Sequence, residues 1–305
     1  MIQSNRLWTP HERPTAVALG FFDGVHLGHG SLLRLAAKKN IAGITHSAAW
    51  SFRIHPDICM KKPTARILTS YEQKLNLFRS YGIDLAIFED FEAVRDCPAD
   101  EFLRDNLFDR CRVRAAVCGY NFTFGKDAKG KPGLLCDVLS KMGAAVLVLP
   151  PASIGDEPIS SSRIRNLIEC GDTETAKTLL GHPFSIFLPV TEGRKIGRTI
   201  GVPTINQVFP EYYAVPRRGV YACRILVDGV SHIGVSNVGV RPTISEGSTV
   251  NCETHIIDFS GWLYGKKIEV DFYKFLRDEV RFPDITSLKA AIDNDIATTK
   301  AYFGK

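Results

Sequence analysis

Residues 20–29 read Gly-Phe-Phe-Asp-Gly-Val-His-Leu-Gly-His, and this glycine-rich stretch joins two segments of opposite pattern. The apolar run 15–19 before it is typical of a buried strand, and residues 31–39 after it are typical of a helix. A strand, a glycine-rich turn and a helix make an anion site, because the helix start offers unpaired N–H groups and the positive end of its dipole. Two histidines three residues apart share one face of the first helical turn. We expect this stretch to hold the triphosphate of ATP through Gly20, Phe22, Asp23, Gly24, His26 and His29.

The rest of the first 150 residues alternates between strand-like and helix-like segments. Apolar runs predict strands at 15–19, 84–88, 114–118 and 145–149. Helical spacing predicts helices at 71–81 and 99–109, with two more at 160–171 and 173–180. This alternation is typical of a parallel sheet that is covered by helices, an α/β fold.

The pattern changes after Pro183, and Gly181-His182-Pro183 is the predicted boundary between a domain of residues 1–182 and one of residues 183–305. Period-2 alternation predicts strands at 184–190, 219–226, 231–238, 249–256 and 267–273. Turn dipeptides at 228–229, 246–247 and 264–265 separate them, and short strands at this spacing indicate a small closed barrel. A helix predicted at 285–303 has one apolar face, which should pack on the barrel.

The bulk properties fit a two-domain globular protein. The chain has 305 residues, of which 45% are hydrophobic and 23% charged. A net charge of +5 is too small to indicate nucleic-acid binding by itself. None of the eight cysteines forms a Cys-x-x-Cys pair, which argues against zinc, and no run approaches the length of a membrane span. We therefore expect free thiols, a cytoplasmic location, and neither a membrane nor a nucleic-acid partner.

A second anion-binding stretch reads Ile-Ser-Ser-Ser-Arg-Ile-Arg over residues 159–165. Its serines can cap the helix that follows, and an arginine just beyond three hydroxyls can hold a triphosphate or a departing pyrophosphate. The expected contacts are Ser161, Ser162 and Arg165.

These two stretches resemble the nucleotidyltransferase half of bacterial FAD synthetases. Residues 26–29 match the His-x-Gly-His motif, and residues 160–165 match the Ser-Ser-Thr-x-x-Arg motif with Ser162 in place of threonine. Residues 52–56 resemble the Phe-x-x-His-Pro segment of that family, and residues 119–126 its flavin-side segment. The resemblance implies flavin contacts at His55, Asn121 and Phe124, although Asn121 and Thr123 stand where many members carry Asp and Arg.

In the second domain, residues 193–206 read Gly-Arg-Lys-Ile-Gly-Arg-Thr-Ile-Gly-Val-Pro-Thr-Ile-Asn. Glycine at every fourth position is unsuited to a strand interior and is typical of a loop near phosphates or of an irregular hairpin. Thr204 and Asn206 point to one side of an extended chain, where their oxygens suit Mg²⁺. The nucleotide contacts expected in this loop are Gly193, Lys195, Gly197, Arg198 and Gly201.

This stretch resembles the Gly-x-x-x-Gly…Pro-Thr-x-Asn motif of riboflavin kinases. Along 250–256, alternation places Glu253 with Asn251 and His255 on the face opposite the apolar residues. Glu253 then matches the Glu-x-His segment of that family, in which the glutamate is the catalytic base. Leu276-Arg277 also matches, which implies a flavin or phosphate contact at Arg277.

The resemblance covers roughly residues 14–303 and implies a Rossmann-like nucleotidyltransferase domain followed by a small riboflavin-kinase β-barrel with a C-terminal helix. It implies the bifunctional riboflavin kinase/FMN adenylyltransferase family, whose members phosphorylate riboflavin to FMN and adenylylate FMN to FAD with a second ATP, releasing pyrophosphate. Mg²⁺ would accompany ATP, and FMN and FAD would be substrate and product rather than prosthetic groups.

Three alternatives remain open from the sequence. A single-activity relative would keep one domain for binding only, but the intact Pro-Thr-x-Asn and Glu253 argue against a dead kinase. An aminoacyl-tRNA synthetase-like protein also uses His-x-Gly-His, but it needs a lysine-rich second motif and a tRNA-binding domain, and neither is found. The pI near 8.7 motivates a third alternative, a non-catalytic regulator that binds flavin or nucleic acid. Such a regulator would bind nucleic acid in a salt-sensitive way. The oligomeric state also stays open.

Overall fold

The computed structural model describes residues 2–4, 13–38, 45–63, 65–193, 197, 200–241 and 249–304. The chain divides into two units, one of residues 1–67 and 71–161 and the other of residues 68–70 and 162–305. The domain boundary predicted near Pro183 stays a prediction. Among the described residues, no helix combines the length and the apolar character that a bilayer crossing needs.

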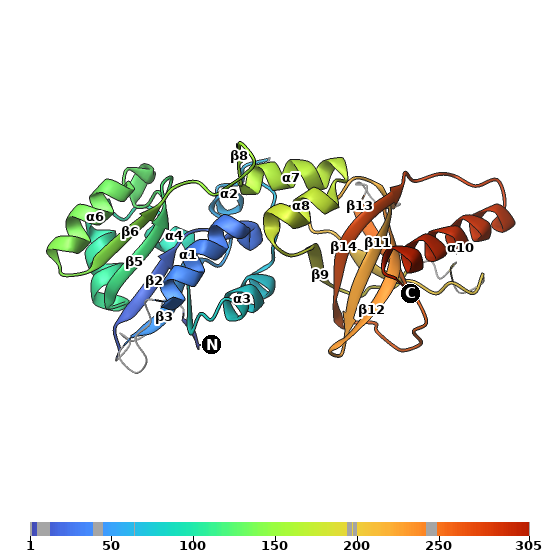
Figure 1. Ribbon diagram of the computed structural model, residues 1–305, viewed down its shortest axis with the longest axis horizontal. Helices are drawn as coiled ribbons and strands as arrows, with labels where there is room; N and C mark the ends of the chain where they lie inside the picture. The colour runs from blue at the N-terminus through green and yellow to red at the C-terminus, as the bar shows by residue number, and fades with distance from the viewer. Residues whose placement is uncertain are drawn as a thin grey trace. The chain divides into compact units, whose positions relative to one another are not determined.

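The first unit is built on a six-stranded sheet in which every neighbouring pair runs parallel, in the order β1-β4-β3-β2-β5-β6 (Figure 1). Its strands are β1 (Ile2–Ser4), β2 (Thr15–Leu19), β3 (His46–Phe52), β4 (Leu85–Glu89), β5 (Val113–Gly119) and β6 (Ala145–Leu149). Its helices are α1 (Leu27–Lys38), α2 (Pro56–Cys59), α3 (Tyr71–Ser80), α4 (Phe91–Val94), α5 (Ala99–Glu101), the π-helix η2 (Phe102–Arg110) and α6 (Pro132–Lys141). Short elements complete it, namely the 3₁₀ turns η1 (Asp23–Val25) and η3 (Lys126–Ala128) and the hairpin of β7 (Ser153–Ile154) and β8 (Glu157–Pro158).

The central strands β2, β3 and β4 are buried on both faces, as expected for parallel strands covered by helices, whereas the edge strand β6 is partly exposed. Alternate residues of β2 point into different cores: Val17 packs with residues of η2 and α6, and Ala18 with residues of α1 and α3. The carboxyl end of β2 therefore delivers residues 20–25 to the edge where α1 begins.

The predicted α/β fold of this half is confirmed, but several of its elements differ from the prediction, and β1 was not predicted. The helix expected from Ser31 begins at Leu27, because His26 is extended and its ring accepts the N–H of His29. Strand β3 was not predicted, because serines interrupt its apolar pattern; the hydroxyl of Ser47, for example, is satisfied by the carbonyl of Gly82. Helix α6 was also not predicted, and the helix expected at 99–109 is α5 continued as a π-helix.

The second unit is a six-stranded antiparallel barrel in the order β10-β13-β12-β11-β14-β9. Its strands are β9 (Phe184–Pro189), β10 (Ile205–Val208), β11 (Gly219–Val227), β12 (Val230–Arg241), β13 (Thr249–Ile256) and β14 (Lys267–Arg277). Its helices are α7 (Ser161–Cys170), whose first residue still belongs to the first unit, α8 (Thr173–Leu180) and α10 (Ile285–Tyr302). The predicted barrel is confirmed, with β10 as a strand that was not predicted; the expected turn at 246–247 lies outside the described residues.

The C-terminal helix packs on the barrel as predicted. Ile296 and Phe303 lie against a core that includes Val220, Ile233 and Val235 of β11 and β12. Figure 1 shows the C-terminal end of α10 beside these two strands. The other end of the helix extends beyond this core, where Leu288 and Ile292 line a cavity.

Candidate active sites

The turn after β2 has an unusual backbone. Phe22 and Val25 adopt left-handed φ angles of 53° and 40°, next to Gly24 at 77°. Non-glycine residues rarely adopt such angles, and they persist only where the surroundings hold them. Here the ring of Phe22 is fully buried and packs edge-on against Phe78 of α3 and against His29 of α1. The turn is therefore a fixed part of the fold.

The predicted residues Asp23 and Ser161 meet at this turn. Asp23 is 2% exposed, and its backbone carbonyl accepts a hydrogen bond of 2.9 Å from the Ser161 hydroxyl. The serine, which belongs to the same unit as Asp23, thus supports the turn. Ser162 and Arg165 belong to the second unit, where the guanidinium of Arg165 donates to the hydroxyl of Ser162 at 3.4 Å.

The two predicted histidines form a stacked pair at the start of α1. Their ring centroids are 3.7 Å apart and the planes differ by 16°. His26 Nδ1 accepts the N–H of His29 at 3.3 Å, so this nitrogen carries no proton and Nε2 is the donor. Burial, the neighbouring His26 and then Lys74 lower the pKa of His29 well below 6.5, so its ring is neutral at pH 7.

Groups that can bind an anion remain at this helix start. His29 Nδ1 is buried and has no hydrogen-bond partner within the part of the chain that the structure describes. The N–H groups of His29 and Gly30 are taken by the ring and the carbonyl of His26. The N–H groups of Leu27 and Gly28 have no hydrogen-bond partner among the described residues. Unpaired N–H groups of this kind bind phosphate at helix N-termini.

Lys74 of α3 also belongs to this region and was not predicted. It is 5% exposed, and its Nζ donates to the carbonyl of Phe21 at 2.9 Å. The sequence did hold a signal, because Lys74 is four residues before Phe78 and so shares the apolar face of its helix.

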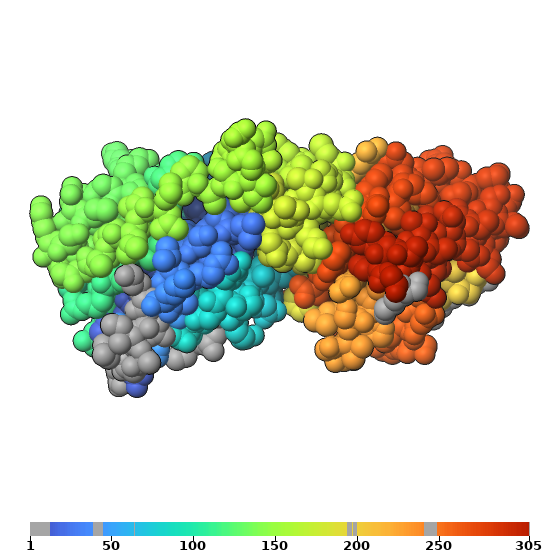
Figure 2. Space-filling view, viewed as in Figure 1, coloured from blue at the N-terminus to red at the C-terminus, as the bar shows by residue number. Residues whose placement is uncertain are grey.

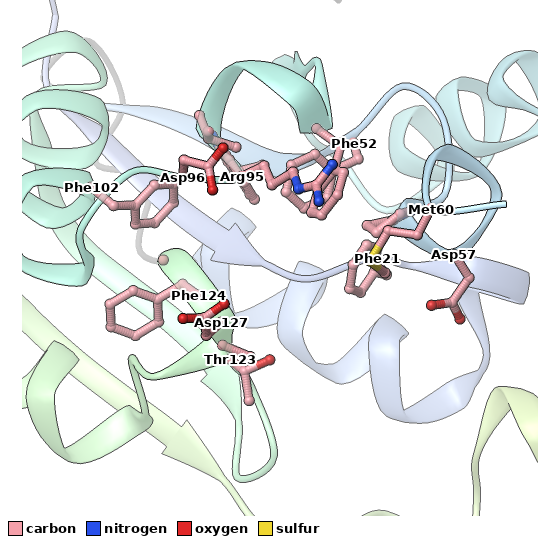
Figure 3. A pocket seen from close by; sticks show the side chains of 16 residues that line it. Phe21, Phe52, Asp57, Met60, Arg95, Asp96, Phe102, Thr123, Phe124 and Asp127 are labelled. Carbon is pink, nitrogen blue, oxygen red and sulfur yellow. The ribbon is translucent and has the colours of Figure 1, made fainter. Parts of the chain in front are cut away.

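An aromatic cavity of about 390 Å³ lies beside the turn (Figure 3). Phe21, at the turn, lines it together with aromatic residues from four other segments, namely Trp50, Phe52, Phe91, Phe102 and Phe124. Figure 3 shows Phe21, Phe52 and Met60 near one end and Phe102, Phe124 and Thr123 near the other. A cavity of this size and lining can hold a flat aromatic ring system.

Of the three predicted flavin contacts of this unit, one lines the cavity, one stacks on a residue that lines it, and one does not belong to the lining. Phe124 lines it, and the ring of His55 stacks on Phe21 at 5.0 Å. His55 Nδ1 also accepts the N–H of Asp57, so His55 caps α2. Asn121 is exposed and does not belong to the cavity lining.

In the second unit, one row of directly paired residues crosses five strands of the barrel. Asn206 of β10 pairs with Glu253 of β13, which pairs with Asn237 of β12; Asn237 pairs with Val220 of β11, and Val220 with Arg277 of β14. Paired residues of antiparallel strands point to the same face. The four residues from Glu253 to Arg277 accordingly line one cavity of about 300 Å³.

Glu253 is the exposed member of this row. Its Oε1 accepts a hydrogen bond of 3.1 Å from Asn251 two residues earlier, and the same amide lies 3.4 Å from the Asn206 oxygen. His255, the next residue on this face, meets the carbonyl of Pro203 through Nδ1 at 2.9 Å, so Nδ1 carries the proton. The glutamate is thus oriented at the cavity and open to a ligand.

Two glycines of the loop at 193–201 lie too close to neighbouring atoms to carry a side chain. A Cβ at Gly193 would lie 2.3 Å from the Asn206 amide nitrogen, and one at Gly197 would lie 2.2 Å from the carbonyl oxygen of Val202. Neither position tolerates a side chain without movement. Gly201 has a φ of 78°, whereas Lys195 and Arg198 lie outside the described residues.

The predicted metal ligands supply two hard oxygen atoms. The Thr204 hydroxyl lies at the cavity, and Asn206 is 7% exposed at its edge strand. Mg²⁺ usually binds to one or two protein oxygens and completes its shell with water and substrate phosphates. The donor set therefore fits Mg²⁺ that arrives with a nucleotide, and the described residues contain no cluster of three or more acidic, histidine or cysteine ligands.

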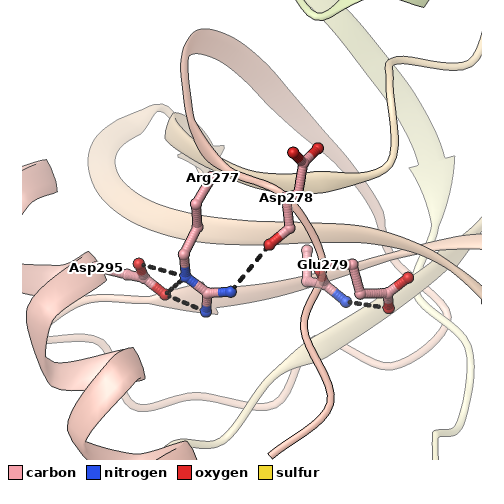
Figure 4. A network of polar contacts seen from close by, with 5 residues as sticks. Arg277, Asp278, Glu279 and Asp295 are labelled. Atoms are coloured by element: carbon pink, nitrogen blue, oxygen red, sulfur yellow. Dashed lines mark hydrogen bonds and ion pairs between the residues drawn. The ribbon is translucent and has the colours of Figure 1, made fainter.

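Arg277 is held by an ion pair with α10 (Figure 4). Its guanidinium meets the Asp295 carboxylate at 2.7 and 3.0 Å, and Asp295 is 3% exposed. Glu279 lies near Asn237 and accepts its amide at 3.3 Å. Because Arg277 and Asp295 both line the cavity, this pair links the helix to the barrel at the site itself.

Comparison with known proteins identifies both halves. The family model described as FAD synthetase matches residues 9–163, and the one described as riboflavin kinase matches residues 180–303. A solved structure from Streptococcus pneumoniae, titled a macrolide-efflux protein, is similar over 98% of this chain and 99% of its own, with a TM-score of 0.87 and 26% identity.

Curated relatives share both halves in one chain. Proteins of Listeria monocytogenes and Bacillus subtilis, each named bifunctional riboflavin kinase/FMN adenylyltransferase, are 32% and 35% identical. The matches cover 98% and 95% of this chain, and 95% and 92% of the relatives. The chain therefore belongs to the bifunctional riboflavin kinase/FMN adenylyltransferase family, with the adenylyltransferase half first and the kinase half second.

Proposed function

We propose that the first unit transfers the adenylyl group of ATP to FMN at the turn between β2 and α1. The FMN phosphate oxygen attacks the α-phosphorus, the bond between the α-phosphorus and the bridging oxygen breaks, and pyrophosphate leaves. Phosphate is already a nucleophile, so the protein has to position two anions and offset their charge. The stacked histidines, with the buried Nδ1 of His29, support this role.

The flavin ring of FMN would occupy the aromatic cavity. Phe21 supports this assignment, since it lines the cavity and its own carbonyl belongs to the turn that precedes the histidines. Stacking on aromatic side chains is the interaction that a flat isoalloxazine makes best. Ser162 and Arg165 would meet the departing pyrophosphate, a role that rests on the motif they match.

The second unit would phosphorylate riboflavin. Glu253 accepts the proton of the riboflavin 5′-hydroxyl, whose oxygen attacks the γ-phosphorus of ATP, and ADP leaves. The row from Glu253 to Arg277 is the observation that carries this proposal, because it brings a carboxylate, an amide and a guanidinium to one cavity.

Mg²⁺ would be held by Thr204 and Asn206. When bound with ATP, it neutralises phosphate charge. Asn251 orients both the Asn206 oxygen and Glu253, so the predicted metal ligand and the predicted base share one hydrogen-bond donor.

Flavin chromatography after incubation with riboflavin, ATP and Mg²⁺ tests both halves together. We expect FMN to form first and FAD to follow. FMN without FAD would contradict the proposal for the first unit. FAD from supplied FMN, but no product from riboflavin, would contradict the proposal for Glu253. Conversion of neither substrate would favour a binding protein.

A further inference from the structure

A buried ammonium group lies beside the adenylylation turn and has no role in the chemistry described above. Lys74 is 5% exposed, yet its Nζ makes one hydrogen bond among the described residues, to the carbonyl of Phe21. Lysine is almost never this buried unless it is paired, because burial removes the hydration of its charge. Such a residue calls for an explanation beyond packing.

Lys74 and Phe78 hold the turn from one face of α3. They are four residues apart, so they lie one above the other on the helix. Phe78 packs against the ring of Phe22 with centroids 5.3 Å apart, and Lys74 binds the carbonyl of the residue before it. Figure 2 shows α1 (blue) and α3 (teal) side by side on one face of this unit, in agreement with the packing of Arg34 on Tyr81. The two helices thus enclose the left-handed turn.

Two titratable groups act on Lys74 from the elements packed against it, Asp23 of η1 and His29 of α1. Burial lowers the pKa of Lys74 from 10.5 to about 8, and the charge of Asp23 opposes that shift. Lys74 is therefore mostly charged at pH 7, and it contributes to keeping His29 neutral. The site therefore holds a buried positive charge next to the neutral ring of His29.

We propose that Lys74 is a positioning residue for FMN adenylylation, which fixes the Phe21–Val25 turn and supplies a buried positive charge that favours binding of the ATP triphosphate. This inference rests on the proposed adenylyltransferase function of the first unit. Lys74 acts through the Phe21 carbonyl and through its charge.

The chain offers a matched control for the charge. The hydroxyl of Ser51 donates to the same Phe21 carbonyl at 3.0 Å, and Ser51 is fully buried. Ser51→Ala removes a neutral donor, Lys74→Met removes a charged one, and Lys74→Arg keeps the charge. We expect Lys74→Met to lower kcat/KM for ATP in FMN adenylylation by about 100-fold, the loss typical of one preorganised donor. Ser51→Ala should lose less than about fivefold, because a neutral hydrogen bond contributes less than one made by a charged group.

The pH dependence separates this role from a structural one. In the wild type, kcat/KM for ATP should fall as the pH rises through about 8, because Lys74 loses its proton in the free enzyme. The free energy of unfolding should change in the opposite direction. Between pH 8 and 10.5 the unfolded chain binds a proton that the folded chain has lost. The contribution of Lys74 to the free energy of unfolding therefore rises with pH. Lys74→Met should abolish both trends.

The kinase activity of each variant, measured as FMN formation from riboflavin, is the internal control and should stay unchanged. Lys74→Arg should retain more adenylylation than Lys74→Met and should lose the alkaline decline. The inference is wrong if Lys74→Met adenylylates FMN like the wild type, if Ser51→Ala loses as much, or if the decline near pH 8 persists in Lys74→Met. A wild-type protein that does not convert FMN would overturn the proposed function as well, so the two failures are distinguishable.

Discussion

At the scale of single residues, Glu253 can act as a base because the strand presents it outward while its neighbours Cys252 and Thr254 are fully buried. Asn251 fixes its direction. Glu253→Gln keeps the shape and the bond to Asn251 but removes the base. FMN formation should fall by about 10²–10⁴-fold, the usual contribution of a general base. The rate is measured by chromatography of flavins at saturating riboflavin.

The same variant carries its own control, because adenylylation of supplied FMN should stay at the wild-type rate. Glu211→Gln, at another exposed position in this unit, should leave both activities unchanged. A variant Glu253→Gln that still makes FMN at the wild-type rate would rule out this residue as the base.

The proposed role of His29 depends on its ring being uncharged. Its lowered pKa keeps the ring neutral at pH 7, so it can offer hydrogen bonds without the cost of a second buried cation beside Lys74. His29→Ala should reduce FAD formation from supplied FMN by at least about 100-fold, since one buried donor to the triphosphate is lost. Incubation with riboflavin should then accumulate FMN, and an undiminished yield of FAD would contradict the assignment.

At the scale of elements, the two end strands of the barrel are joined, within the described residues, by a single backbone bridge between Thr191 and Asn206 and by a buried side chain. Strands β9 and β10 end the sheet, and the amide of Gln207 donates across the gap to the carbonyls of Leu188 and Ile268 at 2.7 and 2.8 Å. Gln207 is fully buried. Gln207→Leu removes both bonds and leaves two buried carbonyls, so the free energy of unfolding should fall by about 2–3 kcal/mol.

Urea unfolding measures this loss, and kinase activity should weaken before adenylylation does, because the change lies in the second unit. A midpoint equal to that of the wild type would mean that the barrel does not need this closure.

The junction of α10 with β14 is a second feature at this scale. Asp295→Asn removes the charge that faces Arg277, and the partly buried guanidinium then loses its partner. Removing one member of a buried pair costs about 3–5 kcal/mol, and less where one partner reaches solvent, as Arg277 does. Because Leu288 and Ile292 of the same helix line the cavity, KM for riboflavin should rise more than kcat falls. Steady-state kinetics of FMN formation decide this, and an unchanged KM would separate the helix from the binding site.

At the scale of the whole molecule, the cavities of the two proposed sites are lined by residues of different units of the chain. FMN is the product of one and the substrate of the other. A mixture of the Glu253→Gln and His29→Ala variants should therefore convert riboflavin to FAD, although neither variant does so alone. Production of FAD is followed by chromatography, and its absence from the mixture would mean that FMN passes only within one chain.

The sequence by itself determined the fold classes and the motifs, because both depend on short-range patterns. Apolar runs and period-2 alternation located most strands to within a few residues, and the stretch 20–29 identified the strand, turn and helix of the anion site. Strand β3 and helix α6 were not predicted in this way. The buried serines of β3 break the apolar pattern, and only their partners elsewhere in the fold make burial acceptable.

Only the tertiary structure decided which residues share a site. Strand register aligns Glu253, Asn237 and Arg277, which are far apart in the chain, and no local pattern specifies register between strands. It also showed that Arg277 faces Asp295, and that a lysine of α3 lies buried beside the turn between β2 and α1. The physical reason is that charge pairing and burial depend on packing between distant segments, whereas strand and helix patterns depend on residues that are close together in the chain.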